Sequence, residues 1–486
     1  MNKPIRTIAV FCLALFLALM VNVTYLQFWK SDRLDEDPRN QRVLQASYSS
    51  ERGAILVGRT PIAESTPVDD RYEFQRLYPQ PFLYAPATGY FTFGNSTGVE
   101  ASQNAVLSGD DPRFFVRRLV DMLSNEPAQG GNVQLTLDPA AQKAAFDGLR
   151  ALGDGVEGAV VAIEPDTGKI LAMVSLPSYD PNKLASHDFD AVENDYQRLL
   201  EDDRDPLINR ALATRLFPGS TFKVVTAAAA LSSGKYEGPD ALVPGGATFQ
   251  LPQTSGESGL IDNEGRNCGS GEITLRQAME QSCNTSFAKL AIDVGAEEMF
   301  RQAERFGFNA DYLEDIKGQA RSVFPADLSE PEVGQAGFGQ FDVQATPLQM
   351  AMVMAAIANR GVLMRPYLVN QVQSAEYDAE TTRPEEISQA VSDDVARTLT
   401  EVLVSTVDNG TAAPSAIPGV RVAGKTGTAQ RGVEGQPPYG WFISFAPADN
   451  AEVAVAVMIE EAPGRSIAGG ALGGPIAKAV MEAVLQ

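Results

Sequence analysis

The sequence predicts an α+β protein in which a five-stranded antiparallel sheet is flanked by helices. Five short stretches are rich in the branched, aromatic and small residues of buried strands. They lie at 159–163, 169–174, 420–429, 441–445 and 453–459. Turn residues at 164–168 and 447–450 join neighbouring strands into antiparallel pairs. Because the strands bracket a largely helical middle region, strands and helices are segregated, which is the α+β arrangement.

An informative helix of the middle region begins close to Ser220. Pro218 and Gly219 interrupt the preceding chain, and the Ala-rich apolar run 222–231 then favours a helix. Lys223 follows Ser220 by three positions, so the two side chains share one face of that helix. Because the helix is largely apolar, we expect the Lys223 ammonium to be partly desolvated.

The Ser-x-x-Lys motif at 220–223 is the first of three motifs whose order and spacing matter more than each motif alone. A Ser-x-Asn motif follows at 282–284, and a Lys-Thr-Gly motif at 425–427. Ser-x-x-Lys also occurs at 232–235, in a polar turn, and at 286–289, inside a second predicted helix whose lysine can extend toward solvent. Only the first copy is therefore a candidate site.

The residue types in these motifs suit nucleophilic catalysis. A serine hydroxyl is activated when a neighbouring base removes its proton. The only histidine, His187, lies in a polar stretch, so a Ser-His-Asp triad would depend on that residue. Lysine is the alternative base when burial and a second ammonium lower its pKa, and Lys425 would supply that ammonium. Ser282 can relay a proton, and the Asn284 amide can bind a substrate peptide bond.

Lys425 lies in a strand pattern that suits the binding of an extended peptide. Residues 420–429 alternate small and branched side chains. The glycines at 424 and 427 let a substrate backbone lie alongside as an added strand.

From about residue 158 to the C-terminus, the sequence resembles the transpeptidase domain of class B penicillin-binding proteins. The three motifs occur in the order and at the spacing of that family. Matching phrases lie at 158–163, 209–211, 337–340, 346–351 and 440–442. The compact layout resembles a short form of the family. The resemblance implies the fold shared by serine β-lactamases and transpeptidases, and inhibition by β-lactams.

The resemblance also implies residue roles. Ser220 would attack the D-Ala-D-Ala bond of a peptidoglycan stem peptide, with Lys223 as the general base. The other catalytic residues would be Ser282, Asn284 and Lys425. The substrate-binding residues would be Thr426, Gly427 and Thr428. Backbone N–H groups of Ser220 and Thr428 would form the oxyanion hole. No cofactor and no metal ion are expected.

Four segments are expected along the chain. They are a cytoplasmic tail at 1–6, a transmembrane anchor at 7–28, a non-catalytic pedestal domain at 29–145 and the transpeptidase domain at 146–486. The anchor has 22 residues without charge, which is long enough to cross a hydrocarbon layer of about 30 Å. No Ala-x-Ala cleavage site follows it, so we expect it to remain attached. The resemblance places the catalytic domain outside the cell membrane and implies a membrane-embedded glycan polymerase as partner.

The pedestal is indicated by phrases at 52–55 and 97–100, which resemble the same family. The phrase at 136–142 resembles its junction with the catalytic domain. There, Asp138 is a suitable helix N-cap and Pro139 a suitable first helical residue. We assign no catalytic residue to this segment.

Composition excludes several functions. The chain has 39 basic and 62 acidic residues and a net charge of −23, which disfavours nucleic acid as a partner. One histidine and three cysteines leave no zinc cluster. Cys12 lies in the anchor, whereas Cys268 and Cys283 lie in the exported part. An oxidising compartment favours a disulfide between these two, and the alternative is a buried Cys283 with a free Cys268.

Three other functions stay open. A serine β-lactamase shares the fold and motifs but needs a base that directs water onto the acyl-enzyme. A D-Ala-D-Ala carboxypeptidase differs only in its acceptor, which is water rather than an amine. A non-catalytic scaffold for cell-wall synthesis enzymes is disfavoured by the intact motifs. For the transpeptidase, roles in cell shape and in cell division are both open.

Overall fold

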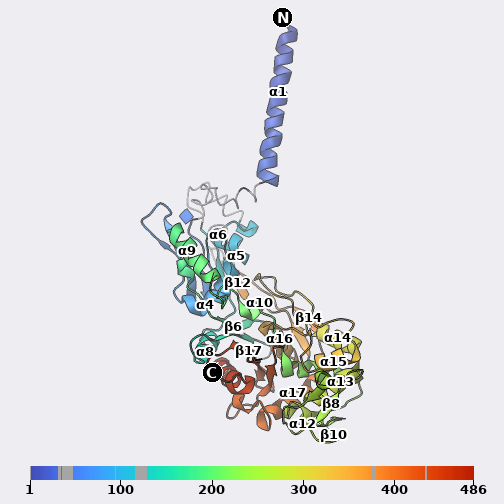
Figure 1. Cartoon of the computed structure of the whole chain (residues 1–486). Helices are drawn as coiled ribbons and strands as arrows, with labels where there is room; N and C mark the ends of the chain where they lie inside the picture. Colours follow the sequence, from blue (N-terminus) through green and yellow to red (C-terminus); the bar gives the residue numbers. More distant parts are fainter. Residues whose placement is uncertain are drawn as a thin grey trace.

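The larger body of the molecule is built on a five-stranded antiparallel sheet. The computed structural model describes residues 2–30, 34, 48–92, 95–114, 129–373, 379–432 and 435–486. The strand order is β15-β16-β17-β5-β6. Of these strands, Figure 1 labels β6 and β17. The strands are β5 (Glu157–Ile163), β6 (Ile170–Leu176), β15 (Ala423–Ala429), β16 (Tyr439–Ala446) and β17 (Val453–Glu461). All five predicted strands are present, and the predicted α+β arrangement is confirmed.

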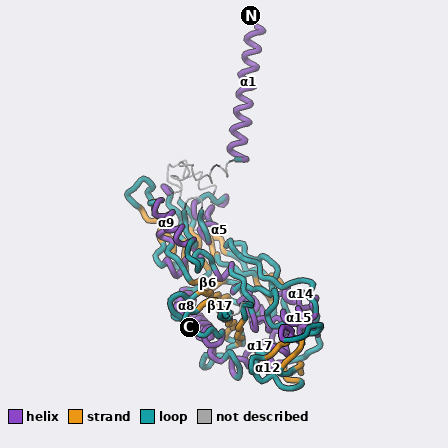
Figure 2. The backbone as a smooth tube through the Cα atoms, in the orientation of Figure 1, coloured by secondary structure: helices purple, strands orange, loops and turns teal. Residues whose placement is uncertain are grey.

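Both faces of this sheet pack against helices because the strands are apolar on both sides. Along β17, residues 453, 455, 457 and 459 belong to one core and residues 454, 456 and 458 to the other, as the two-residue period of a strand requires. The covering helices are α8 (Pro139–Arg150) and α18 (Gly474–Val484) on the first face and α16 (Pro347–Ala358) on the second. Figure 2 shows α8 close to β6. The predicted Asp138 cap is present, because the carboxylate accepts a hydrogen bond from the Ala141 N–H.

The chain between β6 and β15 is mainly helical, as predicted. Its remaining helices are α9 (Phe189–Leu200), α10 (Arg210–Ala213), α11 (Lys223–Ser232), α12 (Leu275–Glu280), α13 (Asn284–Val294), α14 (Ala296–Arg305), α15 (Glu330–Ala336) and α17 (Asp393–Asp408). Three small sheets pair β7 (Leu242–Pro244) with β10 (Glu272–Thr274), β8 (Thr248–Gln250) with β9 (Leu260–Asp262), and β11 (Val362–Met364) with β14 (Glu386–Gln389). Helix α11 is central, because its residues 223–231 are all buried.

A second, six-stranded sheet forms the core of the N-terminal part. Its order is β13-β12-β4-β1-β2-β3. The strands are β1 (Ile55–Val57), β2 (Thr60–Pro67), β3 (Phe74–Leu77), β4 (Asn132–Leu135), β12 (Val369–Gln373) and β13 (Ala379–Thr381). Short helices accompany it: α4 (Pro81–Thr88), α5 (Gly98–Ser102) and α6 (Asn104–Ser108). Because β12 pairs with β4, the sheet joins the ranges 29–145 and 146–486. Within the first range, 31–33, 35–47, 93–94 and 115–128 lie outside the described residues.

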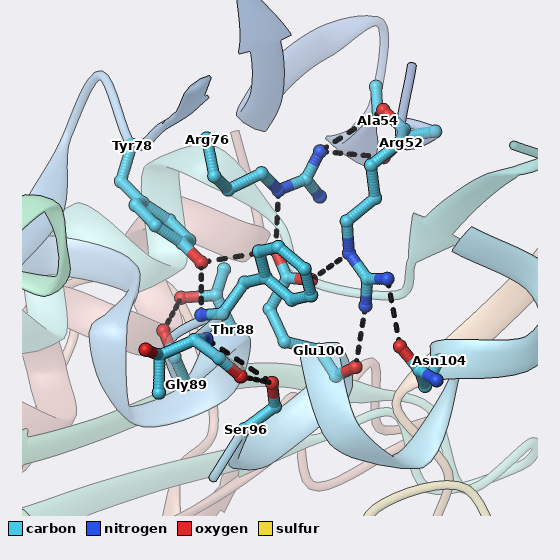
Figure 3. Close-up of polar contacts among 12 residues, drawn as sticks. Arg52, Ala54, Arg76, Tyr78, Thr88, Gly89, Ser96, Glu100 and Asn104 are labelled. Carbon is cyan, nitrogen blue, oxygen red and sulfur yellow. Dashed lines mark hydrogen bonds and ion pairs between the residues drawn. The ribbon is translucent and has the colours of Figure 1, made fainter. Parts of the chain in front are cut away.

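A buried cluster of charges holds this N-terminal part together (Figure 3). The Glu100 carboxylate accepts hydrogen bonds from Arg52 Nε at 2.8 Å and from Arg76 Nε at 2.6 Å. The Tyr78 hydroxyl donates to the same carboxylate at 3.2 Å. Burial raises the pKa of Glu100, but the two guanidinium groups outweigh burial, and the pKa lies below its ordinary value. The two phrases that indicated a pedestal, 52–55 and 97–100, thus meet at one ion cluster.

The N-terminal segment forms a long apolar helix. Helix α1 (Asn2–Thr24) continues through Tyr25–Trp29 as a π-helical turn. The stretch Lys3–Trp29 is long and apolar enough to cross a membrane, and it contains the predicted anchor 7–28.

Candidate active site

Ser220 lies on a tight turn between two closely packed backbones. The turn is a 3₁₀ helix, Gly219–Phe222, that leads directly into α11, so the predicted position at a helix start is confirmed in this form. Gly219 has a φ of +53°, and a Cβ there would lie 2.9 Å from the Thr428 carbonyl oxygen. On the other side, the Gly219 N–H donates to the Gly339 carbonyl at 3.0 Å. Only glycine allows this packing, which fixes Ser220 beside β15.

Lys223 connects the first two motifs. Its Nζ lies 2.9 Å from Ser220 Oγ. It also contacts the Ser282 carbonyl at 2.8 Å, Ser282 Oγ at 3.1 Å and Asn284 Oδ1 at 2.7 Å. The side chain is fully buried. The predicted desolvated lysine beside the serine is therefore present.

Lys425 approaches the same place from β15. Its Nζ donates to Ser282 Oγ at 2.9 Å and to the Thr426 carbonyl at 2.9 Å. Ser282 thus lies between the two lysines, and its φ of +54° is an uncommon backbone conformation for a residue with a side chain. The three motifs, far apart in the sequence, meet at this hydroxyl.

The electrostatics of the site favour a neutral Lys223. Burial lowers the pKa of Lys223 well below its ordinary value, and the nearby charges of Lys425 and Arg266 lower it further. Burial, followed by the charge of Arg266, lowers the pKa of Lys425 to about 7. Removing an ammonium group from water disfavours its charged form, and like charges add to the effect.

The substrate-binding candidates lie on β15, which is an edge strand of the sheet. Thr426 is largely buried, and its hydroxyl lies 2.9 Å from that of Thr411. Thr428 is exposed. A Cβ on Gly427 would lie 2.9 Å from Thr221 Cγ2, so glycine is needed where the turn that carries Ser220 packs against β15.

The other Ser-x-x-Lys copies form no comparable pair. Lys235 is half exposed and forms an ion pair with Asp293. Lys289 is partly buried: it donates to the Gly245 carbonyl at 2.5 Å and lies over the Phe249 ring. Neither lysine takes part in a hydrogen bond to the serine of its own motif among the described contacts.

His187 lies outside this site. Its Nδ1 is 2.6 Å from an Asp70 carboxylate oxygen, and its ring packs against Tyr48 and Tyr72 in the N-terminal part. A triad of Ser220 with His187 is therefore not formed.

A disulfide joins Cys268 to Cys283, the middle residue of the second motif. Cys12, in α1, is free. The bond attaches the loop after β9 to the start of α13.

Two residues near the site escaped the sequence analysis. Arg266 contributes a positive charge that lowers the pKa of both lysines. Asn263 is buried and bonded to the start of α13. Both lie in a polar loop that has the composition of an ordinary turn, so no local signal marks them.

Comparisons with known proteins agree with this geometry. Residues 158–482 match the penicillin binding protein transpeptidase domain, and residues 52–133 match the penicillin binding protein A dimerisation domain. The chain is 42% identical over 493 residues to the peptidoglycan D,D-transpeptidase PbpA of Mycolicibacterium smegmatis, covering 100% of this chain and 99% of the relative.

Solved structures show the same likeness. Penicillin-binding protein A from M. tuberculosis as a ceftriaxone acyl-enzyme complex has a TM-score of 0.86 and 40% identity, covering 91% of this chain and 100% of that one. Its penicillin G acyl-enzyme complex has a TM-score of 0.84 and 40% identity, covering 90% and 100%. The resemblance to the short form, which is called penicillin-binding protein A, is confirmed. The chain belongs to the class B penicillin-binding proteins.

Proposed function

We propose that this protein is a peptidoglycan D,D-transpeptidase that cross-links stem peptides through an acyl-enzyme on Ser220, and that β-lactams acylate the same serine. The observation that carries the proposal is the fully buried Lys223 Nζ, 2.9 Å from Ser220 Oγ. Related proteins with the same fold carry the name of this activity or form acyl-enzymes with β-lactams.

The hydrogen bonds of Lys223 suit a general base. Carbonyl oxygens can only accept hydrogen bonds, and a neutral amine has two N–H groups and one lone pair. The Ser282 carbonyl at 2.8 Å and Asn284 Oδ1 at 2.7 Å occupy the two N–H groups. The lone pair is then left for a hydroxyl proton, and Ser220 is the nucleophile within reach.

Acylation then proceeds as follows. Ser220 Oγ loses its proton to Lys223 and bonds to the carbonyl carbon of the penultimate D-alanine. The C–N bond to the last D-alanine breaks, and its nitrogen takes a proton from Lys223 through Ser282. In the second half, an acceptor amine attacks the acyl carbon and loses a proton to Lys223 along the same route. Lys223 then returns a proton to Ser220 Oγ as the bond between Ser220 Oγ and the acyl carbon breaks. Lys425 supports this relay through its bond to Ser282 Oγ.

The other predicted roles follow from position. Asn284 would bind a substrate peptide bond. Thr426, Gly427 and Thr428 would bind the donor peptide along the edge of β15, with the threonines at its carboxylate. Backbone N–H groups of Ser220 and Thr428 would stabilise the oxyanion.

Labelling with fluorescent penicillin tests the proposal. We expect one adduct, mapped by mass spectrometry to Ser220 and absent in Ser220→Ala. Ser232→Ala and Ser286→Ala are matched controls from the other two Ser-x-x-Lys copies, and both should label like the wild type. An adduct on Ser232 or Ser286 would refute the assignment.

The fate of the acyl-enzyme separates the transpeptidase from a β-lactamase. A β-lactamase needs a base for water. The Glu264 carboxylate, whose negative charge acts on the pKa of Lys223, is paired with Arg266 at 2.9 Å. This favours slow hydrolysis. A carboxypeptidase would release D-alanine from a stem peptide without needing an amine acceptor.

The segments and their setting complete the proposal. We place a membrane anchor at 7–28, a non-catalytic pedestal at 29–145 and the catalytic domain at 146–486, on the extracytoplasmic side. A membrane-embedded glycan polymerase would be the partner. The apolar helix Lys3–Trp29 supports the anchor. Protease added to intact cells should remove the catalytic domain and leave α1 in the membrane, whereas protection of the domain would refute the orientation.

A further inference from the structure

The end of β9 and the loop that follows it are bonded to residues 283–285 at three places. Asn284 Nδ2 donates to the Asp262 carbonyl at 3.0 Å. The Thr285 N–H donates to Asn263 Oδ1 at 3.1 Å. The disulfide of Cys268 with Cys283 is the third connection. The end of the motif and the residue after it are therefore held by residues that precede them by 15 to 22 positions.

Helix α13 needs such help because its own N-cap is unsuitable. The N-cap residue is Cys283, whose sulfur is in the disulfide and makes no capping hydrogen bond. A helix start leaves N–H groups without partners inside the helix, and an N-cap side chain normally accepts from one of them. Here Asn263 Oδ1, from a separate loop, accepts from Thr285 instead.

The hydrogen bonds of Asn263 require an amide. The side chain is almost completely buried. Its Nδ2 donates to the Gly246 carbonyl at 2.8 Å, to the Ala247 carbonyl at 3.2 Å and to Thr285 Oγ1 at 3.1 Å, while Oδ1 accepts. Aspartate keeps the acceptor but loses the donor, and alanine loses both.

Asn284 links the start of α13 to the general base, Lys223. It directly precedes Thr285, and its side-chain amide connects two groups. Its Oδ1 accepts from Lys223 at 2.7 Å, while its Nδ2 donates to the residue before Asn263. A shift of the α13 start would therefore move the acceptor away from Lys223.

We propose that Asn263 is a positioning residue for the transfer reaction: it caps α13 from outside and so fixes Asn284 against Lys223. This inference rests on the proposed function. Asn263 itself contacts neither Ser220 nor Lys223 in the described hydrogen bonds.

The test compares Asn263→Ala and Asn263→Asp with a matched control, Asn182→Ala. Asn182 likewise bridges backbone groups, donating to the Tyr78 carbonyl at 3.0 Å and accepting from the Tyr78 N–H at 2.8 Å, beyond β6 at the opposite edge of the sheet from β15. In full-length protein, the limiting rate of penicillin acylation should fall roughly 10- to 100-fold in Asn263→Ala, since small misplacements of a catalytic group cost about that much. In Asn263→Asp, which keeps the acceptor that caps α13, the acylation rate should fall less. This variant is used if Asn263→Ala does not fold. Asn182→Ala should acylate like the wild type.

Two further readouts separate positioning from simple loss of stability. Hydrogen exchange in the peptide 282–289 should rise in Asn263→Ala and not in Asn182→Ala. The acid limb of the acylation rate should also move to lower pH in Asn263→Ala, because losing the Asn284 acceptor disfavours the charged form of Lys223.

The outcomes are distinct. Unchanged exchange at 282–289 overturns the inference whether or not the protein is acylated. Raised exchange with a wild-type acylation rate and pH profile overturns the positioning role. If penicillin does not acylate the wild-type protein, the proposed function is refuted, and so is any role of Asn263 in that reaction. The hydrogen-exchange result would still decide whether Asn263 caps α13.

Discussion

Replacing Glu100 by glutamine should strongly destabilise the N-terminal sheet. The carboxylate is fully buried and serves both Arg52 and Arg76, at 2.8 and 2.6 Å. Glutamine keeps the shape of the side chain but carries no charge. Two buried guanidinium groups would then lack their counter-charge.

The size of the effect follows from this count of charges. Removing one partner of a buried ion pair costs about 3–5 kcal/mol, because the other charge stays buried without compensation. Arg52 keeps the Glu100 carbonyl and Asn104 as acceptors, and Arg76 keeps the Gly53 carbonyl. These neutral contacts limit the loss, so we expect a cost within that range. It is a large part of the roughly 5–15 kcal/mol that stabilises a typical domain.

Urea unfolding of the full-length protein in detergent measures this cost. Trp441, buried in β16, reports the large sheet by fluorescence, and near-ultraviolet circular dichroism reports the tyrosines buried around the cluster. Glu298→Gln is a control, because Glu298 pairs with Arg301 at the exposed surface and such pairs contribute little. Equal stability of Glu100→Gln and Glu298→Gln would refute the reasoning.

The pH dependence gives a second check. The pKa of Glu100 is lowered in the folded protein, since the guanidinium groups outweigh the effect of burial. A lowered pKa contributes stability that is present above the unfolded-state pKa and is lost as the pH falls through the folded-state pKa. The difference between wild type and Glu100→Gln should therefore be constant near neutral pH and shrink in acid. A difference that grew in acid would contradict this sign.

Four further predictions concern the site. Lys223→Ala should acylate with penicillin at least ~10²-fold more slowly, which is within the usual range of general-base catalysis, and an unchanged rate would mean that another base operates. Lys425→Ala should bind penicillin more weakly. It should also move the acid limb of the acylation profile to higher pH, because one of the charges that add to burial in lowering the pKa of Lys223 is gone; a shift to lower pH would contradict this. The penicillin acyl-enzyme should hydrolyse over minutes or longer, on the order expected without a base for water, whereas many turnovers per second would indicate a β-lactamase. Alkylation of unreduced, unfolded protein should modify Cys12 alone, and reduction should cost roughly 3 kcal/mol, the value for a ring of about fifteen residues; three modified cysteines would refute the bond.

Local patterns were sufficient to predict the large sheet and the three motifs. Strand alternation and turn residues are properties of neighbouring positions, and they located all five strands. The predicted start of the edge strand β15 was less accurate, because the strand begins at residue 423 rather than 420. Predicted and observed strands differ at their ends because a flanking residue joins the hydrogen-bonded ladder only when a partner residue lies opposite.

Long-range contacts could not be predicted in the same way. Asn263 matters through hydrogen bonds to residues 246–247 and 285, and nothing in its own neighbourhood encodes them. The contacts of Lys289 with Gly245 and Phe249 also come from outside its own helix. The pairing of β12 with β4 likewise depends on segments more than two hundred positions apart, as in the pair Val133 and Val372.

That pairing also constrains the order in which the chain can fold during synthesis. A ribosome delivers β1 to β4 early, but β12 and β13 emerge only after most of the catalytic residues. Until then, the edge of β4 that β12 will cover has open backbone N–H and C=O groups, which is a surface prone to wrong pairing. A fragment that stops at residue 145 would keep that edge exposed permanently. Residues 369–381 therefore complete the first-made sheet from the late part of the chain, and the N-terminal part reaches its final form only when most of the polypeptide exists.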